Sequence, residues 1–92
     1  MIVRILGEGQ YRLDDAAFAK AGEFDDRVQA AAEAGDEAAF AAALSELLDV
    51  ITASGTELAA DEFEGSDAVI PGHGTTLAEA RDLLSSEGLI PN

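Results

Sequence analysis

The first fifteen residues constrain the fold most, because they predict a tight β-hairpin that leads directly into a helix. Val3 and Ile5 share one face of the first strand, and Gly7-Glu8-Gly9 supplies two glycines for the positive φ angles of a turn. Matching the apolar residues of the two strands predicts that Val3 lies opposite Leu13. The same register places Ile5 opposite Tyr11. A lone hairpin is not stable in water, so it must pack on helices and, we expect, on another chain.

The opposite face of the predicted hairpin mixes apolar and basic side chains, namely Ile2, Arg4, Leu6 and Arg12. The predicted register sets Arg4 directly across from Arg12, which is unfavourable unless a carboxylate lies between them. That carboxylate would come from this chain, for example from Asp14, or from a partner. The face is too apolar for water and too charged for a sealed core. We therefore predict that these four residues bind a partner and that two hairpins pair or stack in a homodimer.

Two helices are predicted after the hairpin. Asp14 or Asp15 suits the N-cap of the first, and Gly35 suits its C-terminal end. Asp36 caps the second helix and Gly55 ends it. Because only Gly35 and Asp36 separate them, the two helices must form an antiparallel hairpin. The residues that recur at helical spacing are Ala17, Ala21, Phe24, Val28 and Ala31 in the first helix, and Phe40, Leu44, Leu47, Leu48 and Ile51 in the second.

This helical core is thin. Alanine supplies much of both stripes, so the helices bury little area per residue, and Leu44 or Leu47 is expected to be the most sensitive position. Gly22 weakens the middle of the first helix by about 1 kcal/mol relative to alanine and permits a kink there. Burial in this small core offsets little of the conformational entropy that the chain loses on folding. This is a second reason to expect a partner.

The segment from Thr56 to Thr75 is predicted to be irregular, anchored by Leu58 and Phe63. Within it, the short apolar run 68–70 is closed by Pro71, which is typical of an edge strand.

A last helix is predicted to begin at Thr76, where Glu79 completes a capping box. Leu84 would lie on its apolar face and Gly88 would end it. The sequence therefore predicts an α+β fold in one domain, residues 1–92. Its elements are an N-terminal hairpin, two antiparallel helices, a possible short third strand and a C-terminal helix.

The charge of the chain excludes several kinds of partner. Nineteen acidic residues against five basic ones give a net charge of −14. Nucleic acid and anionic membrane surfaces would repel such a chain, and no apolar stretch predicts membrane insertion. A salt-rich cytoplasm or a solvated face without special meaning is favoured as the explanation of this acidity over an acidic docking surface. With no leader apparent and no cysteine, we expect a cytoplasmic protein without disulfides or a thiolate metal site.

Candidate chemistry is sparse. His73, the single histidine, lies in a glycine-flanked loop and has no nucleophile or second metal ligand beside it in the sequence. The acid pairs Asp25-Asp26 and Asp61-Glu62 lack the ligand spacing of a calcium loop. Gly7-Glu8-Gly9 is not followed by the helix that a phosphate loop requires. The sequence therefore predicts no enzyme, no cofactor and no metal.

Five motifs, spread in order over nearly the whole chain, resemble one known family. They are Met1-Ile-Val-Arg-Ile-Leu-Gly-Glu-Gly-Gln-Tyr11, Glu33-Ala-Gly-Asp-Glu-Ala-Ala-Phe40, Ser66-Asp-Ala-Val-Ile-Pro71, Thr76-Leu-Ala-Glu79 and Glu87-Gly-Leu-Ile-Pro91. The chain resembles the PspAA domain, the small protein associated with phage shock protein A. The first and last motifs are specific in combination, whereas the alanine-rich helices would match many proteins.

The resemblance implies a cytoplasmic accessory of the phage shock system, which protects the inner membrane during envelope stress. It also implies a partner, PspA, a long coiled-coil protein that assembles on membranes, and it brings no catalytic residues. The leading hypothesis is an adaptor that binds PspA or a neighbouring component. The alternatives are a ligand-binding or enzymatic module that uses the loop around His73, and a purely self-associating acidic module.

Overall fold

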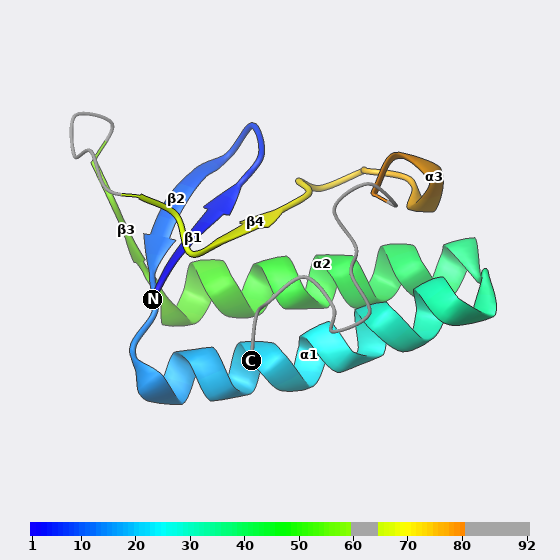
Figure 1. The fold of residues 1–92 in the computed structure, drawn as a ribbon, viewed down its shortest axis with the longest axis horizontal. Coiled ribbons are helices and arrows are strands. Elements are labelled where there is room, and N and C mark those ends of the chain that lie inside the picture. Colours follow the sequence, from blue (N-terminus) through cyan, green and yellow to red (C-terminus); the bar gives the residue numbers. More distant parts are fainter. Residues whose placement is uncertain (60–64, 81–92) are drawn as a thin grey trace.

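A computed structural model of the chain describes residues 1–59 and 65–80, and it has the predicted α+β architecture. A four-stranded sheet packs on one side of a long helical hairpin (Figure 1). The elements are β1 (Ile2–Ile5), β2 (Gly9–Arg12), α1 (Asp15–Ala34), α2 (Glu37–Ser54), β3 (Thr56–Glu57), β4 (Ala68–Ile70) and α3 (Leu77–Ala80). The predictions for Phe63, Leu84 and Gly88 lie outside the described residues.

Local capping sets the limits of the two long helices. Asp14, and not Asp15, is the N-cap of α1, and Asp36 is the N-cap of α2; each carboxylate accepts the backbone N–H three residues further on. Gly35 ends α1 with a φ of 69°, the left-handed conformation that glycine adopts without strain. The helix runs through Gly22 without a break. The antiparallel hairpin is therefore confirmed, and the kink permitted by Gly22 is absent.

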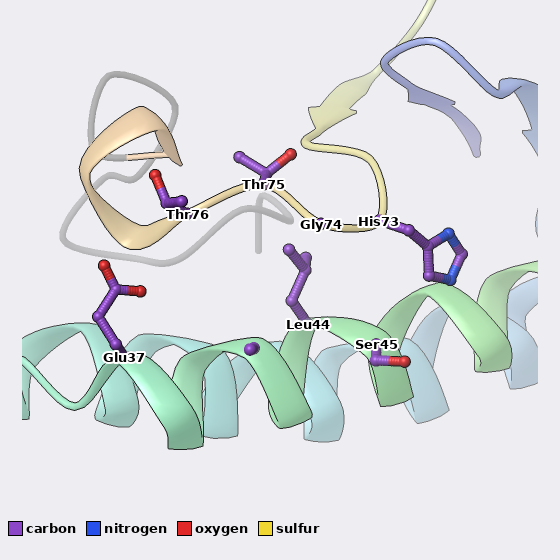
Figure 2. Close-up of a pocket in the computed structure, with 8 residues that line it drawn as sticks. Glu37, Leu44, Ser45, His73, Gly74, Thr75 and Thr76 are labelled. Atoms are coloured by element: carbon purple, nitrogen blue, oxygen red, sulfur yellow. The ribbon is translucent and has the colours of Figure 1, made fainter.

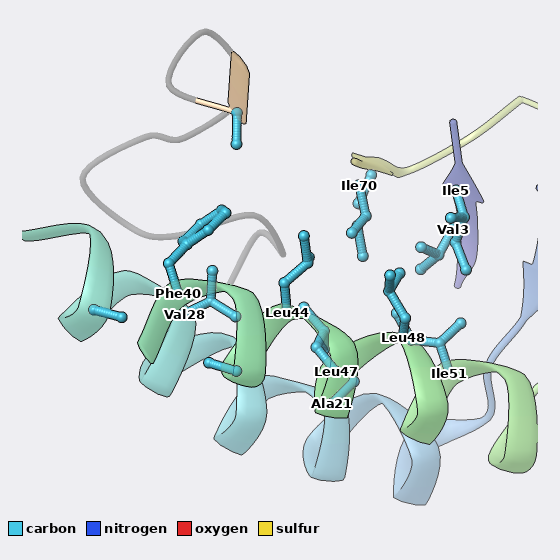
Figure 3. Packing of buried hydrophobic residues seen from close by; sticks show 14 of the residues in the cluster. Val3, Ile5, Ala21, Val28, Phe40, Leu44, Leu47, Leu48, Ile51 and Ile70 are labelled. Carbon is cyan, nitrogen blue, oxygen red and sulfur yellow. The ribbon is translucent and has the colours of Figure 1, made fainter. Parts of the chain in front are cut away.

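The core lies on both sides of α2, which is covered by α1 on one side and by the sheet on the other (Figures 1 and 3). Leu47 lies near Ala21 of α1, whereas Leu48 is directed toward Val3 of the sheet (Figure 3). All five predicted apolar residues of α2 are buried. In α1 the alanines and the valine of the predicted stripe are buried, and Phe24 is half-buried beneath the guanidinium of Arg27.

The predicted register of the hairpin is wrong by two residues. Val3 pairs with Tyr11, and Arg4 pairs with Gln10. The cause is a tighter turn than expected, because the Ile5 carbonyl accepts the Glu8 N–H at 2.9 Å. A shift of two residues preserves the faces of the strands, so Val3 still faces the core. It does, however, remove the arginine pair that the sequence predicted.

Two further strands flank the hairpin, giving the sheet order β3-β2-β1-β4. β4 is the predicted edge strand, and it runs parallel to β1. β3 was not predicted; its two residues pair antiparallel with β2. Because β1 and β2 each have a neighbour on both sides, neither edge of the hairpin is open to the hairpin of a second copy.

Gly55, between α2 and β3, packs closely against the end of β2 and the residue that follows it. A Cβ atom at this position would lie 2.8 Å from Cδ2 of Leu13 and 3.2 Å from the carbonyl oxygen of Arg12. Gly55 ends α2 as predicted, but in an extended conformation with a φ of −88°. Glycine is therefore needed at this position because the chain at the end of β2 lies too close for a side chain. No left-handed conformation is involved.

Candidate partner-binding surface

One corner of the outer sheet face exposes two large apolar side chains beside an arginine. Arg4 pairs with Val69 across β1 and β4, so both side chains point away from the helices. Leu6 continues the same alternation just beyond β1. Leu6 is 46% exposed and Val69 37%, and among the described residues these are the two exposed large hydrophobic side chains. We call Arg4, Leu6 and Val69 the Arg4 corner.

Arg4 is exposed and, across residues 1–59 and 65–80, makes no ion pair. The residue opposite it, Gln10, donates a hydrogen bond from Nε2 to Oγ of Ser66 at 2.8 Å. The carboxylate that the sequence analysis required between two facing arginines is therefore unnecessary. Arg4 is left as an exposed cation with apolar neighbours in a chain that carries five basic residues in all.

The other two predicted residues, Ile2 and Arg12, lie opposite each other at the far end of the hairpin strands. Ile2 is only 7% exposed, and its backbone is held by Asp67. The Ile2 N–H donates to Oδ2 of Asp67 at 2.8 Å, and the Asp67 N–H donates to the Ile2 carbonyl at 2.7 Å. Arg12 is exposed beside Thr56. The structure thus brings Arg4 and Leu6 together and leaves Ile2 little surface to offer a partner.

Val69 was missed in the sequence analysis. Its neighbours Ala68 and Ile70 are both buried, at 7% and 0% exposure. Because side chains alternate along a strand, the middle residue of a three-residue edge strand with two buried ends must face outward. The burial of Ala68 and Ile70 comes from the structure, so the apolar run 68–70 alone did not show which of its side chains faces outward.

The loop around His73 is joined to the hairpin turn by hydrogen bonds to Glu8. The His73 N–H donates to Oε2 of Glu8 at 2.7 Å, and Nδ1 of the ring lies 2.8 Å from Oε1 of the same carboxylate. On the other side of the ring, Nε2 lies 3.9 Å from Oδ1 of Asp49 on α2. The hairpin turn, the loop before α3 and α2 therefore meet at one imidazole.

Glu8 is the centre of this contact, and its pKa lies below the ordinary value of 4.5. The main cause is the backbone N–H of His73, which stabilises the ionised carboxylate; the His73 ring adds to it, and partial burial opposes both. A group with a lowered pKa in the folded state stabilises the fold above its unfolded pKa. That contribution is lost as the pH falls through the folded pKa.

Glu8→Gln is therefore expected to destabilise the fold by about 0.5–1.5 kcal/mol near neutral pH, the usual net contribution of a hydrogen bond. The gap to the wild type should begin to narrow as the pH falls below about 4.5, where the carboxylate of the unfolded chain starts to bind a proton, and should close once the pH is below the lowered pKa of Glu8 in the fold. Thermal unfolding at several pH values measures it, with the exposed Glu23→Gln as a control of equal charge change. A gap that stays constant into acid would contradict the assigned role of the carboxylate.

A small pocket lies between this loop and α2 (Figure 2). Its volume is about 210 Å³, below the range of about 300–1,000 Å³ usual for small-molecule sites. Ser45 and His73 both line it, but among the described residues no hydrogen bond joins them as a nucleophile and its base. The side chain of Thr75 donates instead to the carbonyl of Gly72 at 2.7 Å. This geometry gives the enzymatic alternative little support.

The acidic residues are dispersed in the part of the chain that the structure describes. Asp25 is buried on α1 at 3% exposure, whereas the adjacent Asp26 is exposed. Within that part, no three acidic or histidine side chains are grouped as a metal site would require. The other acid pair considered, Asp61-Glu62, lies outside it.

A comparison with protein families gives one match that spans the whole chain. The PspAA family model, described as PspA-Associated protein, matches residues 1–92. No curated protein and no solved structure matches the chain. None of the described helices is both long enough and apolar enough to cross a membrane.

Proposed function

The chain belongs to the PspA-associated protein (PspAA) family, and on this basis we propose that it is a cytoplasmic, non-enzymatic adaptor of the phage shock response. Its partner is PspA or a neighbouring component of the same membrane-stress system. The family is described by its association with PspA and not by a reaction, which supports a binding role. The Arg4 corner is the surface at which this adaptor binds.

The observation that carries the proposal is the exposure of Leu6 and Val69 beside Arg4. Protein interfaces favour arginine within apolar surroundings, because the guanidinium offers several donors and its stem adds apolar contact. Leu6 and Val69 would lose their remaining contact with water when a partner covers them. A carboxylate of the partner would form an ion pair with Arg4, which makes no ion pair among the described residues.

The net charge narrows the class of partner. A chain of charge −14 is repelled by phosphate backbones and by anionic lipid, so a protein surface with charges of both signs suits it better. A carboxylate at Arg4 and basic groups opposite the acidic remainder of the chain would orient the partner. Because exposed charges are screened beyond about 8–10 Å at moderate ionic strength, binding should weaken as salt is added.

The homodimer predicted from the sequence remains a proposal, and of its two predicted arrangements only the stacking of the two hairpins fits the sheet. β3 and β4 flank the hairpin on both sides, so the two hairpins cannot pair edge to edge. A dimer that used the Arg4 corner would compete with PspA there. Light scattering of the isolated chain at micromolar concentration measures its oligomeric state.

Arg4→Glu is expected to weaken PspA binding by about tenfold or more without unfolding the domain, since attraction to a carboxylate becomes repulsion. The matched control is Lys20→Glu on the exposed surface of α1. Each variant exchanges one positive for one negative charge, so both change the net charge from −14 to −16. Calorimetry with purified PspA at low and high salt measures the affinities.

The comparison of these two variants separates local from general electrostatics. If Arg4→Glu weakens binding and Lys20→Glu does not, the partner contacts the Arg4 corner. Equal effects of both would mean that net charge alone governs association. Binding that ignores both variants and added salt would contradict the electrostatic adaptor and favour an apolar contact between helices.

A further inference from the structure

The outer edge of β4 presents backbone groups that the sheet itself does not use. β4 is the last strand in the order β3-β2-β1-β4, so one of its sides has no neighbouring strand among the described residues. The Leu6 N–H donates to the Ile70 carbonyl at 2.9 Å, which shows that the backbone of Ile70 faces β1. Because backbone groups alternate in direction along a strand, the N–H and C=O of Val69 face the open side.

This edge has only one of the protections that natural edge strands commonly carry, its short length. A very short strand, a lysine, an inward charge, a bulge or a proline within the strand normally prevents an edge from pairing with another chain. β4 consists of Ala68, Val69 and Ile70, with no charge and with its proline only afterwards, at Pro71. The opposite edge, β3, has only two residues, both exposed, and one is the acidic Glu57.

The open edge and the Arg4 corner are continuous, because Val69 belongs to both. Its backbone faces the edge, and its side chain lies beside Arg4 on the outer face. A strand added along β4 would place every second side chain on that same outer face, next to Val69. An apolar side chain there would cover Val69, and a neighbouring carboxylate would come within reach of the long Arg4 side chain.

We propose that β4 binds its partner by strand addition: an extended segment of PspA with an apolar residue and a carboxylate pairs with the backbone of Val69 as a fifth strand. The inference rests on the proposed function and adds the mode of binding. Main-chain hydrogen bonds supply affinity in this mode, and the side chains beside Val69 supply selectivity.

Two substitutions of Val69 separate strand addition from side-chain docking. Val69→Pro removes the outward N–H and sets a ring in its place, while the backbone groups of Ala68 and Ile70 that face β1 are untouched. Val69→Ala keeps the N–H and only shortens the side chain. Strand addition predicts that the proline variant weakens PspA binding by about tenfold or more and the alanine variant by about threefold or less.

Amide hydrogen exchange tests the same contact in the unsubstituted chain, so the inference does not depend on whether Val69→Pro folds. The Val69 N–H should exchange rapidly in the isolated chain and become protected when purified PspA is added. Equal losses from both variants, with a Val69 amide that stays unprotected in the complex, would overturn strand addition and leave the adaptor intact. Absence of PspA binding by the wild-type chain would overturn PspA as the partner and, with it, this inference. Protection of Val69 without PspA, together with a dimeric mass, would assign the edge to a second copy and also overturn the inference.

Discussion

Leu47→Ala is expected to lower the free energy of unfolding by about 2–5 kcal/mol. Leu47 is fully buried between α1 and α2, and the stripe of α1 that faces α2 consists largely of alanine. Such short side chains cannot move far enough to refill the space, so most of the cavity should remain. Since small domains are stable by only about 5–15 kcal/mol, this one change should remove a large share of the total. Chemical denaturation followed by circular dichroism measures it.

Leu6→Ala is the matched control, because it makes the same truncation at a residue that is 46% exposed. Its effect on stability should stay within about 0.5 kcal/mol, as for most surface substitutions. Leu44→Ala should fall at the low end of the range for Leu47→Ala, since Leu44 already lines the open pocket beside Thr75. If Leu47→Ala unfolds at the same midpoint concentration of denaturant as the wild type, the helical hairpin is not the core.

Gly72→Ala is expected to destabilise the fold by about 1–3 kcal/mol, as overpacking of a filled site does. A Cβ atom at Gly72 would lie 2.5 Å from the carbonyl oxygen of Leu6 and 2.8 Å from Oε2 of Glu8. The carbonyl belongs to the backbone and cannot rotate away, so the loop must separate from the hairpin turn. Thermal unfolding measures the loss of stability.

Gly22→Ala is the control for a glycine-to-alanine substitution, and it is expected to stabilise the fold. Gly22 lies inside α1, and an added Cβ would meet no atom within 4 Å. Alanine there should raise the stability by up to about 1 kcal/mol, through helix propensity and a less flexible unfolded chain. If both variants shift the unfolding midpoint in the same direction, close packing at Gly72 is not what holds the loop to the hairpin.

The elements that follow from local chemistry could be predicted from the sequence. Asp14 and Asp36 cap their helices with their own carboxylates, and Gly35 ends α1 in the left-handed conformation. The capping box of Thr76 and Glu79 is also confirmed, with the Thr76 N–H donating to Oε1 of Glu79 at 3.1 Å. Each of these signals needs only residues three or four positions apart.

The contacts between distant segments could not be predicted in this way. The hairpin register depended on a turn that closes at Glu8, and apolar matching alone did not distinguish two registers with the same faces. The strand β3 is too short to show a pattern. The contact of Glu8 with His73 joins residues 65 positions apart, and the position of Val69 beside Arg4 appears only once β4 is placed parallel to β1. The proposed surface therefore keeps Arg4 and Leu6 from the sequence and takes Val69 from the structure.

The most direct test of the adaptor is a titration of the isotope-labelled chain with unlabelled PspA, followed by the backbone amide signals. Binding at the Arg4 corner predicts that the signals of Arg4, Leu6 and Val69 shift or disappear first, while that of Lys20 on α1 changes little. Signals that change along the exposed surfaces of α1 and α2 while the Arg4 corner stays as it was would contradict the proposed surface. A spectrum unchanged by PspA at every residue would contradict PspA as the partner of this chain.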